Sequence, residues 1–301
     1  MRITQNSMNR TQLMGLNDSL GRLQKTQEQL TSGKRIGRAS DDPVGTVSAM
    51  RLRGDQRMLE QYGENITDGL SRLRAADDAL ARTGDILGRV RQQVVAAANG
   101  VNGPSERKAY AEEIRQLKAA MTQVMNTQYA GRPIFAGTAY DPANTNAFDP
   151  ATGTFLGDGK QVIRRISDAP GTAGEIDVAV SGDTAVGDLL AGPGGAPGVL
   201  DRILADLASG ADLGPRLGEL DSVRVAMSSA QATIGAKTNR LEGLQDLNGR
   251  QGDASAIALS KVEDVDFIKA AMDLNIQSNA YNAALQASAK IIQPSLMDFL
   301  R

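Results

Sequence analysis

The sequence predicts a mainly α-helical protein, a long coiled-coil helical bundle rod with a small inserted β-rich domain, in which the N- and C-terminal helices pair. Apolar residues recur at an interval of seven through residues 43–98, which is the spacing of a coiled-coil seam. A similar alternation of three and four residues returns near both ends of the chain. Between residues 131 and 198 the heptads stop, and prolines, glycines and short alternating runs indicate strands and turns.

The helix predicted over residues 43–98 carries the most regular pattern. Its seam positions are Leu52, Leu59, Ile66, Leu73, Leu80, Leu87 and Val94. A helix of this length spans about 84 Å at about 1.5 Å per residue. The positions three residues further on are mostly small, so a partner helix can approach closely. A compact domain does not need such a helix, and we therefore expect the function to lie in packing against other helices.

Both ends of the chain are predicted to form the surface through which subunits assemble. The N-terminal seam consists of Leu13, Leu16, Leu20, Leu23, Gln27 and Leu30. The C-terminal seam includes Phe267, Leu274, Ser278, Tyr281, Leu285, Ile292 and Phe299. The polar members Gln27 and Ser278 are expected to restrict the register of pairing at some cost in stability. A weak interruption of the helix is expected at residues 249–252, which begin and end with glycine.

The segment between the first two helices is predicted to be a tight turn that ends in a helix cap. Its residues include Gly33, Arg35, Ile36, Ser40, Asp41, Asp42 and Pro43. Gly33 suits the position after a helix, where the backbone takes a positive φ. Asp42 can accept hydrogen bonds from the free amides of the next helix, and Pro43 suits its first turn. Two adjacent carboxylates also suggest metal or acid-base chemistry, but acids before a proline at a helix start are far more often caps.

The composition argues against several classes of function. The 301 residues include no cysteine and no histidine, which removes disulfides, thiolate nucleophiles, the usual zinc ligands and Ser-His-Asp triads. We expect no enzyme activity, no metal site and no cofactor. The 33 basic residues nearly balance the 35 acidic ones, so nucleic acid is not an expected partner. No apolar run approaches roughly 18 residues, so membrane insertion is not expected, and the N-terminus lacks the apolar segment of a cleaved signal peptide.

Several segments of the chain resemble known proteins. Residues 32–36 (Ser-Gly-Lys-Arg-Ile) and 39–43 (Ala-Ser-Asp-Asp-Pro) resemble the N-terminal signature of the flagellin superfamily of axial proteins, and the likeness extends along nearly the whole chain. Residues 131–138 (Gly-Arg-Pro-Ile-Phe-Ala-Gly-Thr) are similar to the turn after the third helix in one group of this superfamily, the flagellar hook-filament junction proteins. Residues 154–160 and 295–300 also resemble that group, which consists of hook-associated proteins.

The resemblance implies a nested architecture. Residues 1–42 and 254–301 would form a terminal coiled-coil domain, residues 43–135 and 199–253 a helical rod domain, and residues 136–198 a small β-rich outer domain. The implied function is that of a structural subunit of the bacterial flagellum at the junction between hook and filament. The implied partners are other copies of the chain, a hook-associated protein on the hook side, flagellin on the filament side and an export chaperone. The implied location is the extracellular flagellum, after export by the flagellar type III system without a cleaved signal peptide.

Three other functions remain open from the sequence. The first is flagellin itself, the main filament subunit, because the two groups share the terminal signature and the heptads. The second is a cytosolic coiled-coil scaffold, which would explain the heptads but not the match over residues 30–45. The third is an enzyme inserted at residues 136–198, although the lack of histidine excludes zinc-protease inserts of the kind that some flagellins resemble.

Overall fold

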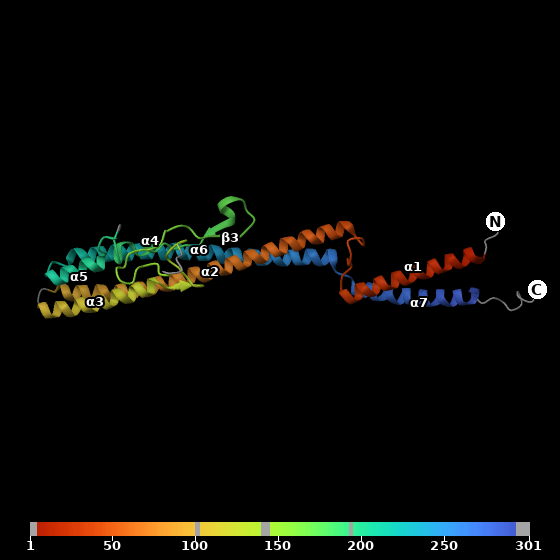
Figure 1. Ribbon diagram of the computed structural model, residues 1–301, viewed down its shortest axis with the longest axis horizontal. Helices are drawn as coiled ribbons and strands as arrows, with labels where there is room; N and C mark the ends of the chain where they lie inside the picture. The colour runs from red at the N-terminus through yellow and green to blue at the C-terminus, as the bar shows by residue number, and fades with distance from the viewer. Residues whose placement is uncertain (1–4, 100–102, 140–144, 193–194, 293–301) are drawn as a thin grey trace, which may run out of the picture. The chain divides into compact units, whose positions relative to one another are not determined.

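The protein is mainly α-helical, as the sequence predicts, with a few very short strands in the middle of the chain (Figure 1). The computed structural model describes residues 5–99, 103–139, 145–192 and 195–292, and the side chains of these residues except 5–9 and 290–292. The chain forms two compact units. Unit one is drawn from residues 1–58 and 251–301, and unit two comprises residues 59–250.

Helix α2 (Pro43–Ala98) has the limits that the sequence predicts. From Ile66 to Val94 its heptad positions are buried, with exposed fractions of 3% or less. The companion positions are also buried, and they include Tyr62, Ala76 and Thr83. Thr83 donates its hydroxyl proton to the carbonyl of Ala79 at 2.8 Å, so this polar residue is satisfied within its own helix. The period-seven pattern therefore marks the core face of the longest helix.

Unit two is built around α2 by three further helices. Helix α3 (Pro104–Met125) runs antiparallel to α2, since Gln93 bonds Glu113 near one end of the pair and Thr83 lies beside Met125 toward the other. Helix α5 (Val199–Ser209) packs against α3. Helix α6 (Gly214–Glu263), together with the residue just before it, supplies a second row of buried residues at an interval of seven, namely Leu213, Leu220, Met227, Ile234 and Leu241. Leucine and isoleucine at these positions close the core.

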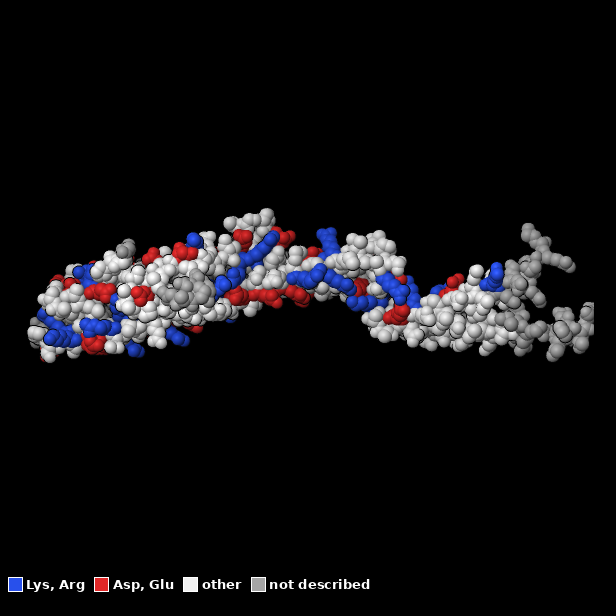
Figure 2. All heavy atoms as spheres, in the orientation of Figure 1, with Lys and Arg blue, Asp and Glu red and all other residues white. Residues whose placement is uncertain are grey.

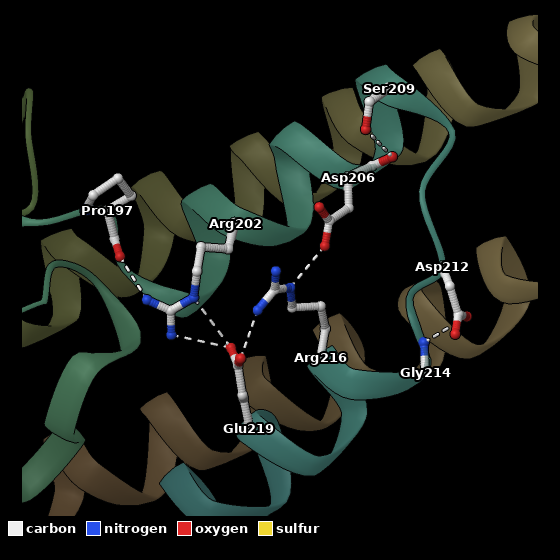
Figure 3. Close-up of polar contacts among 8 residues, drawn as sticks. All are labelled: Pro197, Arg202, Asp206, Ser209, Asp212, Gly214, Arg216 and Glu219. Carbon is white, nitrogen blue, oxygen red and sulfur yellow. Dashed lines mark hydrogen bonds and ion pairs between the residues drawn. The ribbon is translucent and has the colours of Figure 1, made fainter.

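A network of ion pairs fixes α5 on the first turns of α6 (Figure 3). Arg216 lies 2.7 Å from the Asp206 carboxylate and 2.5 Å from that of Glu219. Arg202 shares Glu219 at 3.0 Å and donates to the carbonyl oxygen of Pro197 at 2.7 Å. All four charged side chains are at least two-thirds buried. Each carboxylate therefore has a cation in a setting where water screens the pair only partly.

Replacing Arg216 by methionine should lower the stability of unit two by about 1 to 2 kcal/mol, because Asp206 loses its cation in a partly buried site. The matched control is Arg250→Met on the same helix, since Arg250 pairs with Asp246 on the open surface. That variant should change stability by less than about 0.5 kcal/mol. Urea denaturation followed by circular dichroism measures both. Equal losses in the two variants would show that the network contributes no more than a surface ion pair.

The inserted segment between α3 and α5 contains the strands. Strand β1 (Gln128–Tyr129) pairs with β2 (Arg132–Pro133), and β3 (Ile163–Arg165) pairs with β4 (Glu175–Asp177), both antiparallel. The remaining elements are the short helices α4 (Gly182–Val186), η1 (Gly171–Gly174) and η2 (Gly187–Leu189). The heptad spacing of α3 would extend that helix to Gln128. The helix ends at Met125 instead, and Gln128 lies in β1.

The insert is anchored on α2 by two arginines. The buried Arg72 of α2 donates to the carbonyl oxygen of Ile134 at 3.0 Å. Arg164 of β3 pairs with Asp68 of α2 at 2.9 Å. Apolar residues of the insert, including the fully buried Phe135, belong to the same core as the heptad residues of α2. The small β portion therefore extends the core of unit two.

The prediction of a helix interruption at residues 249–252 is wrong, because α6 continues through both glycines to Glu263. A glycine costs a helix roughly 1 kcal/mol relative to alanine, which is too little to end a long packed helix. The break lies instead at residues 264–266, before α7 (Phe267–Ile292). There the Asp266 carboxylate accepts hydrogen bonds from the amides of Ile268 and Lys269, both at 3.1 Å, and so caps α7.

Helix α1 (Gln5–Ser32) pairs with α7 in unit one, as the fold class predicts (Figure 1). The two helices run antiparallel, since Gly33 lies beside Phe267 at one end and Thr26 bonds Gln277 further along. Among the described residues, no helix is both long enough and apolar enough to span a bilayer.

Candidate assembly surface and its anchoring turn

The turn between α1 and α2 is tied to the end of α6. Gly33 has a φ of +71°, a left-handed conformation that strains any residue with a side chain. Its carbonyl oxygen accepts a hydrogen bond from the amide of Val265 at 3.0 Å. Two residues later, the amide of Arg35 donates to the carbonyl oxygen of Glu263 at 2.6 Å. Glycine is suited to the start of the turn because these backbone bonds form while residue 33 has a positive φ.

Glu263 is the charged centre of this contact. The residue is only 4% exposed, and its carboxylate lies 2.7 Å from the ammonium of Lys34 and also pairs with Arg53 of α2. Arg35 adds a bond from its guanidinium to the carbonyl oxygen of Val262 at 2.7 Å. A carboxylate at the C-terminal end of a helix faces the negative end of the helix dipole and is unfavourable without cations. The turn supplies one of those cations, Lys34, and α2 supplies the other, Arg53.

Asp42 caps α2, and Pro43 is the first residue of that helix. The Asp42 carboxylate accepts a hydrogen bond from the Gly45 amide at 2.8 Å, and its carbonyl oxygen accepts one from Thr46 at 2.8 Å. A Cβ atom on Gly45 would lie 2.6 Å from Cδ1 of Ile36 and would also collide with the capping carboxylate. Glycine at position 45 therefore lets the cap and the buried Ile36 lie against the first turn of the helix.

Hydrogen bonds keep both carboxyl groups of the turn ionised. The amide of Gly45 is the main cause that lowers the pKa of Asp42. The Lys25 ammonium, 2.8 Å from Asp41, lowers the pKa of that carboxyl, and the amide of Arg38 at 2.9 Å adds to the effect. A group meant for proton transfer near neutral pH would need its pKa raised. The two carboxylates therefore act as hydrogen-bond acceptors and ion-pair partners.

Asp42→Ala should loosen the start of α2, because the Gly45 amide loses its acceptor. The pKa of Asp42 lies below its ordinary value of 3.8 in the folded protein. Its stabilising contribution is therefore fully present above that ordinary value and is lost as the pH falls through the folded pKa. Thermal melts should show the variant melting lower at pH 7, and the difference should shrink below about pH 4.

The control for this prediction is Asp18→Ala, which removes an exposed acid from α1 and should leave the melt unchanged. Coincident melts of wild-type protein and the Asp42 variant at pH 7 would contradict the capping role.

The α1–α7 pair is formed by positions spaced alternately by four and three residues. On α1 the buried or half-buried positions are Gln12, Leu16, Ser19, Leu23, Thr26 and Leu30. On α7 they include Ala270, Leu274, Gln277, Tyr281, Ala284 and Ser288. We call these two sets the inner seam. Seven of these twelve residues are small or polar, so the apolar contact between the two helices is thin.

Twelve of the larger apolar side chains of unit one are exposed, and we call them the outer apolar surface. They are Leu13, Met14, Val44, Val47, Met50, Met58, Ile257, Phe267, Ile268, Met272, Ile276 and Leu285. In the described part of the unit, by contrast, the buried apolar residues are Ile36, Ala49 and Ala270. Figure 2 shows few charged side chains on the visible face of α1 and α7. An apolar surface of this extent is typical of an interaction site.

The structure divides the sequence-predicted assembly residues between these two faces. On the inner seam lie Leu16, Leu23, Leu30, Leu274 and Tyr281. The exposed members are Leu13, Gln27, Phe267 and Leu285, and the half-buried members beside the seam are Leu20 and Ser278. Ile292 is the last residue of α7, and Phe299 lies outside the described residues. Of the turn residues, Gly33, Arg35, Ile36, Asp41, Asp42 and Pro43 make the contacts above, whereas Ser40 is exposed.

Sequence reasoning missed several residues of the turn and of the inner seam. Glu263 carries a signal in retrospect, since an acid in the last turn of a helix needs a fixed cation. Asp266, just before an apolar helix start, has the sequence signature of a cap. Thr26 and Gln277 carry no such signal, because an apolar pattern assigns polar residues to the outside.

The described residues show exposed apolar side chains on helices and no cluster suited to metal chemistry. No group of three or more His, Cys, Asp or Glu residues in this part of the chain could hold a metal ion. The carboxylates of the turn are already engaged by Lys25, Arg35 and the amide of Gly45. The arrangement can thus hold a turn rigid and present apolar helices to a partner.

Comparison with solved structures identifies the fold. A flagellar hook-associated protein-3 from Legionella pneumophila superposes with a TM-score of 0.57 at 16% identity, over 71% of this chain and 98% of that one. FlgL from Bacillus cereus superposes with a TM-score of 0.57 at 21% identity, over 70% of this chain and 99% of that one. Both show the same arrangement of long helices.

Comparison of sequences identifies the family. Residues 3–140 match the family model described as the bacterial flagellin N-terminal helical region. Flagellin of Bacillus subtilis is 30% identical over the full length of both chains. Flagellin of Halalkalibacterium halodurans is 28% identical over 93% of this chain and 91% of the relative. The chain therefore belongs to the flagellin family, as a non-enzymatic structural protein of the extracellular part of the bacterial flagellum that assembles with other flagellar proteins.

Proposed function

We propose that the protein is the subunit that joins the hook-associated proteins to the flagellin filament, and that it assembles through unit one. The observation that supports this proposal is the outer apolar surface. A helix pair with little buried apolar area gains its stability from neighbours. Other copies of the chain, a hook-associated protein on one side and flagellin on the other are the neighbours that a junction subunit would have.

The segment after α3 favours the junction over the bulk filament. Residues 131–138 resemble the turn of the junction proteins, and in this chain they hold the insert on α2 through the Arg72 bond to Ile134. The hook-associated protein of Legionella pneumophila and the FlgL of Bacillus cereus share the fold. These likenesses support a junction subunit with a small insert.

The same proposal includes a division of the chain and a route of delivery. Residues 1–42 and 254–301 would be the terminal assembly domain, residues 43–135 and 199–253 the helical domain, and residues 136–198 an outer domain. Export through the flagellar type III channel, with a chaperone holding the terminal helices before assembly, fits helices that expose apolar side chains.

A second candidate, the main filament subunit, is favoured by the identity of 30% to Bacillus subtilis flagellin along the whole chain. Copy number separates the two roles. A junction subunit occupies a short zone at the filament base, whereas flagellin extends along the entire filament.

Deletion of the gene, followed by electron microscopy and analysis of the medium, tests the proposal. Loss of a junction subunit should leave hooks without filaments and release unassembled flagellin into the medium. Antibody labelling of complemented cells should then mark only the filament base. Labelling along the whole filament, with no flagellin released by the deletion strain, would identify the main filament subunit instead.

A further inference from the structure

A side-chain hydrogen bond joins the two helices of the α1–α7 pair across the inner seam. The hydroxyl of Thr26 donates to Oε1 of Gln277 at 2.9 Å. We propose that this pair sets the register in which α1 and α7 associate. The inference rests on the proposed role of unit one in assembly, because it names the residues that fix the alignment of the assembling helices.

Burial makes the pair selective. Thr26 is 6% exposed, and Gln277 is half-buried opposite it. The threonine hydroxyl also lies 3.1 Å from the carbonyl oxygen of Arg22 in its own helix, so Thr26 has an acceptor in any register. A shift of the helices would separate Thr26 from Gln277 and remove the bond between the helices. Losing a hydrogen bond between partly buried groups costs stability, so this pair disfavours shifted registers.

The apolar part of the seam discriminates poorly between registers. On α1 it repeats as Leu16, Leu23 and Leu30, at an interval of seven. The residues opposite on α7 also repeat at seven, and several are small, including Ala270 and Ser288. Sliding one helix by a heptad therefore replaces one apolar or small contact with a similar one. A single polar pair within a repeating seam is a known means of specifying register in coiled coils.

Register matters because it places the outer apolar surface. Ile268, Met272 and Ile276 on α7 are more than half exposed, as are Leu13 and Met14 on α1. A slip of seven residues moves one set past the other by about 10.5 Å. A neighbouring helix that packs against both sets would then meet them at a changed spacing. The Thr26–Gln277 bond thus helps to fix the spacing of the two apolar sets, further along the pair than the turn contacts of Gly33 and Arg35.

The chain lacks cysteine, so introduced thiols report register without background. Leu30→Cys is combined, one at a time, with Ala270→Cys, Leu274→Cys and Tyr281→Cys in the full-length chain. Mild oxidation is carried out in sulfate, which strengthens apolar burial. In the wild-type background Leu30→Cys should cross-link with Ala270→Cys and Leu274→Cys, which flank it in the native register, on the order of tenfold more than with Tyr281→Cys, which lies one heptad beyond Leu274. The double variant Thr26→Val with Gln277→Leu should lose this preference and should incorporate into filaments at a reduced level.

Two further variants complete the test. Thr31→Val with Gln286→Leu makes the same changes at exposed positions and should behave as wild type. The exchanged pair, Thr26→Gln with Gln277→Thr, keeps a hydrogen bond across the seam and should restore the preference. The inference is overturned if the Thr26→Val, Gln277→Leu variant keeps its cross-linking preference, or if it loses that preference yet assembles normally. It is also overturned if the exposed control loses the cross-linking preference. Incorporation is scored anywhere on the flagellum, so the result does not depend on whether the protein is a junction or a filament subunit.

Discussion

Replacing Ile276 and Leu285 by aspartate should abolish incorporation into the flagellum and leave unit two folded. Both side chains lie on the outer face of α7, with exposed fractions of 65% and 42%. In the free protein the new carboxylates stay in water, so the change in folding stability should stay within about 0.5 kcal/mol per residue. In an assembled interface each would be buried without a partner, at a cost of several kcal/mol.

Three measurements test this prediction. They are circular dichroism of the purified variant, swimming of a strain that carries it, and flagellin in the medium of that strain. The control is Ile163→Asp on β3, which alters a residue of similar exposure in unit two. It should assemble. Normal filaments on the Ile276/Leu285 strain would remove the outer face of α7 from the mechanism, and a collapsed circular dichroism spectrum would mean that the face stabilises the monomer.

Limited proteolysis of the free protein should cut α1 and α7 on the order of a hundredfold faster than the helices of unit two. The buried apolar residues in the described part of unit one are few, whereas α2, α3 and α6 share a continuous core in unit two. Local opening of α1 and α7 therefore exposes little apolar surface and requires little free energy. Mass spectrometry of the fragments should find a resistant product close to residues 59–250.

The same digestion of assembled flagella provides the control. Neighbouring subunits should cover the outer apolar surface and protect both helices. Equal resistance of the two units in the free protein would mean that the α1–α7 pair is stable without partners, and the outer apolar surface would then need another explanation.

The fold could be predicted from the sequence wherever one physical signal dominates. The heptads of α2 name the residues of its core, from Ile66 to Val94. The cytosolic scaffold and the inserted enzyme, which the heptads and the composition left open, are excluded by membership in the flagellin family. The strands of the insert are shorter than their alternating runs, because β3 and β4 pair only with each other over three residues each.

The inner seam could be predicted only in part, because apolar periodicity assumes that a seam collects the apolar residues. In α1 the structure instead buries Ser19 and Thr26 and exposes Leu13. Small residues allow two helices to approach closely, and the leucines are left for other neighbours. The Glu263 contact was also out of reach, since it joins residues more than two hundred positions apart. Such pairings follow from the tertiary arrangement and leave no periodic trace.

The uniform heptads of α2 and α6 make misaligned folding intermediates a hazard for unit two. A chain that closes these helices one repeat out of step still buries leucine against leucine, so the error would be corrected slowly. Asn248 opposes this error, because its side-chain amide donates to the carbonyl oxygen of Leu59 at 2.9 Å and lies against Gly63. A leucine at position 248 would remove that bond and extend the repeat. Refolding of Asn248→Leu should therefore acquire a slow phase, as subunits escape from a kinetic trap that the native asparagine avoids.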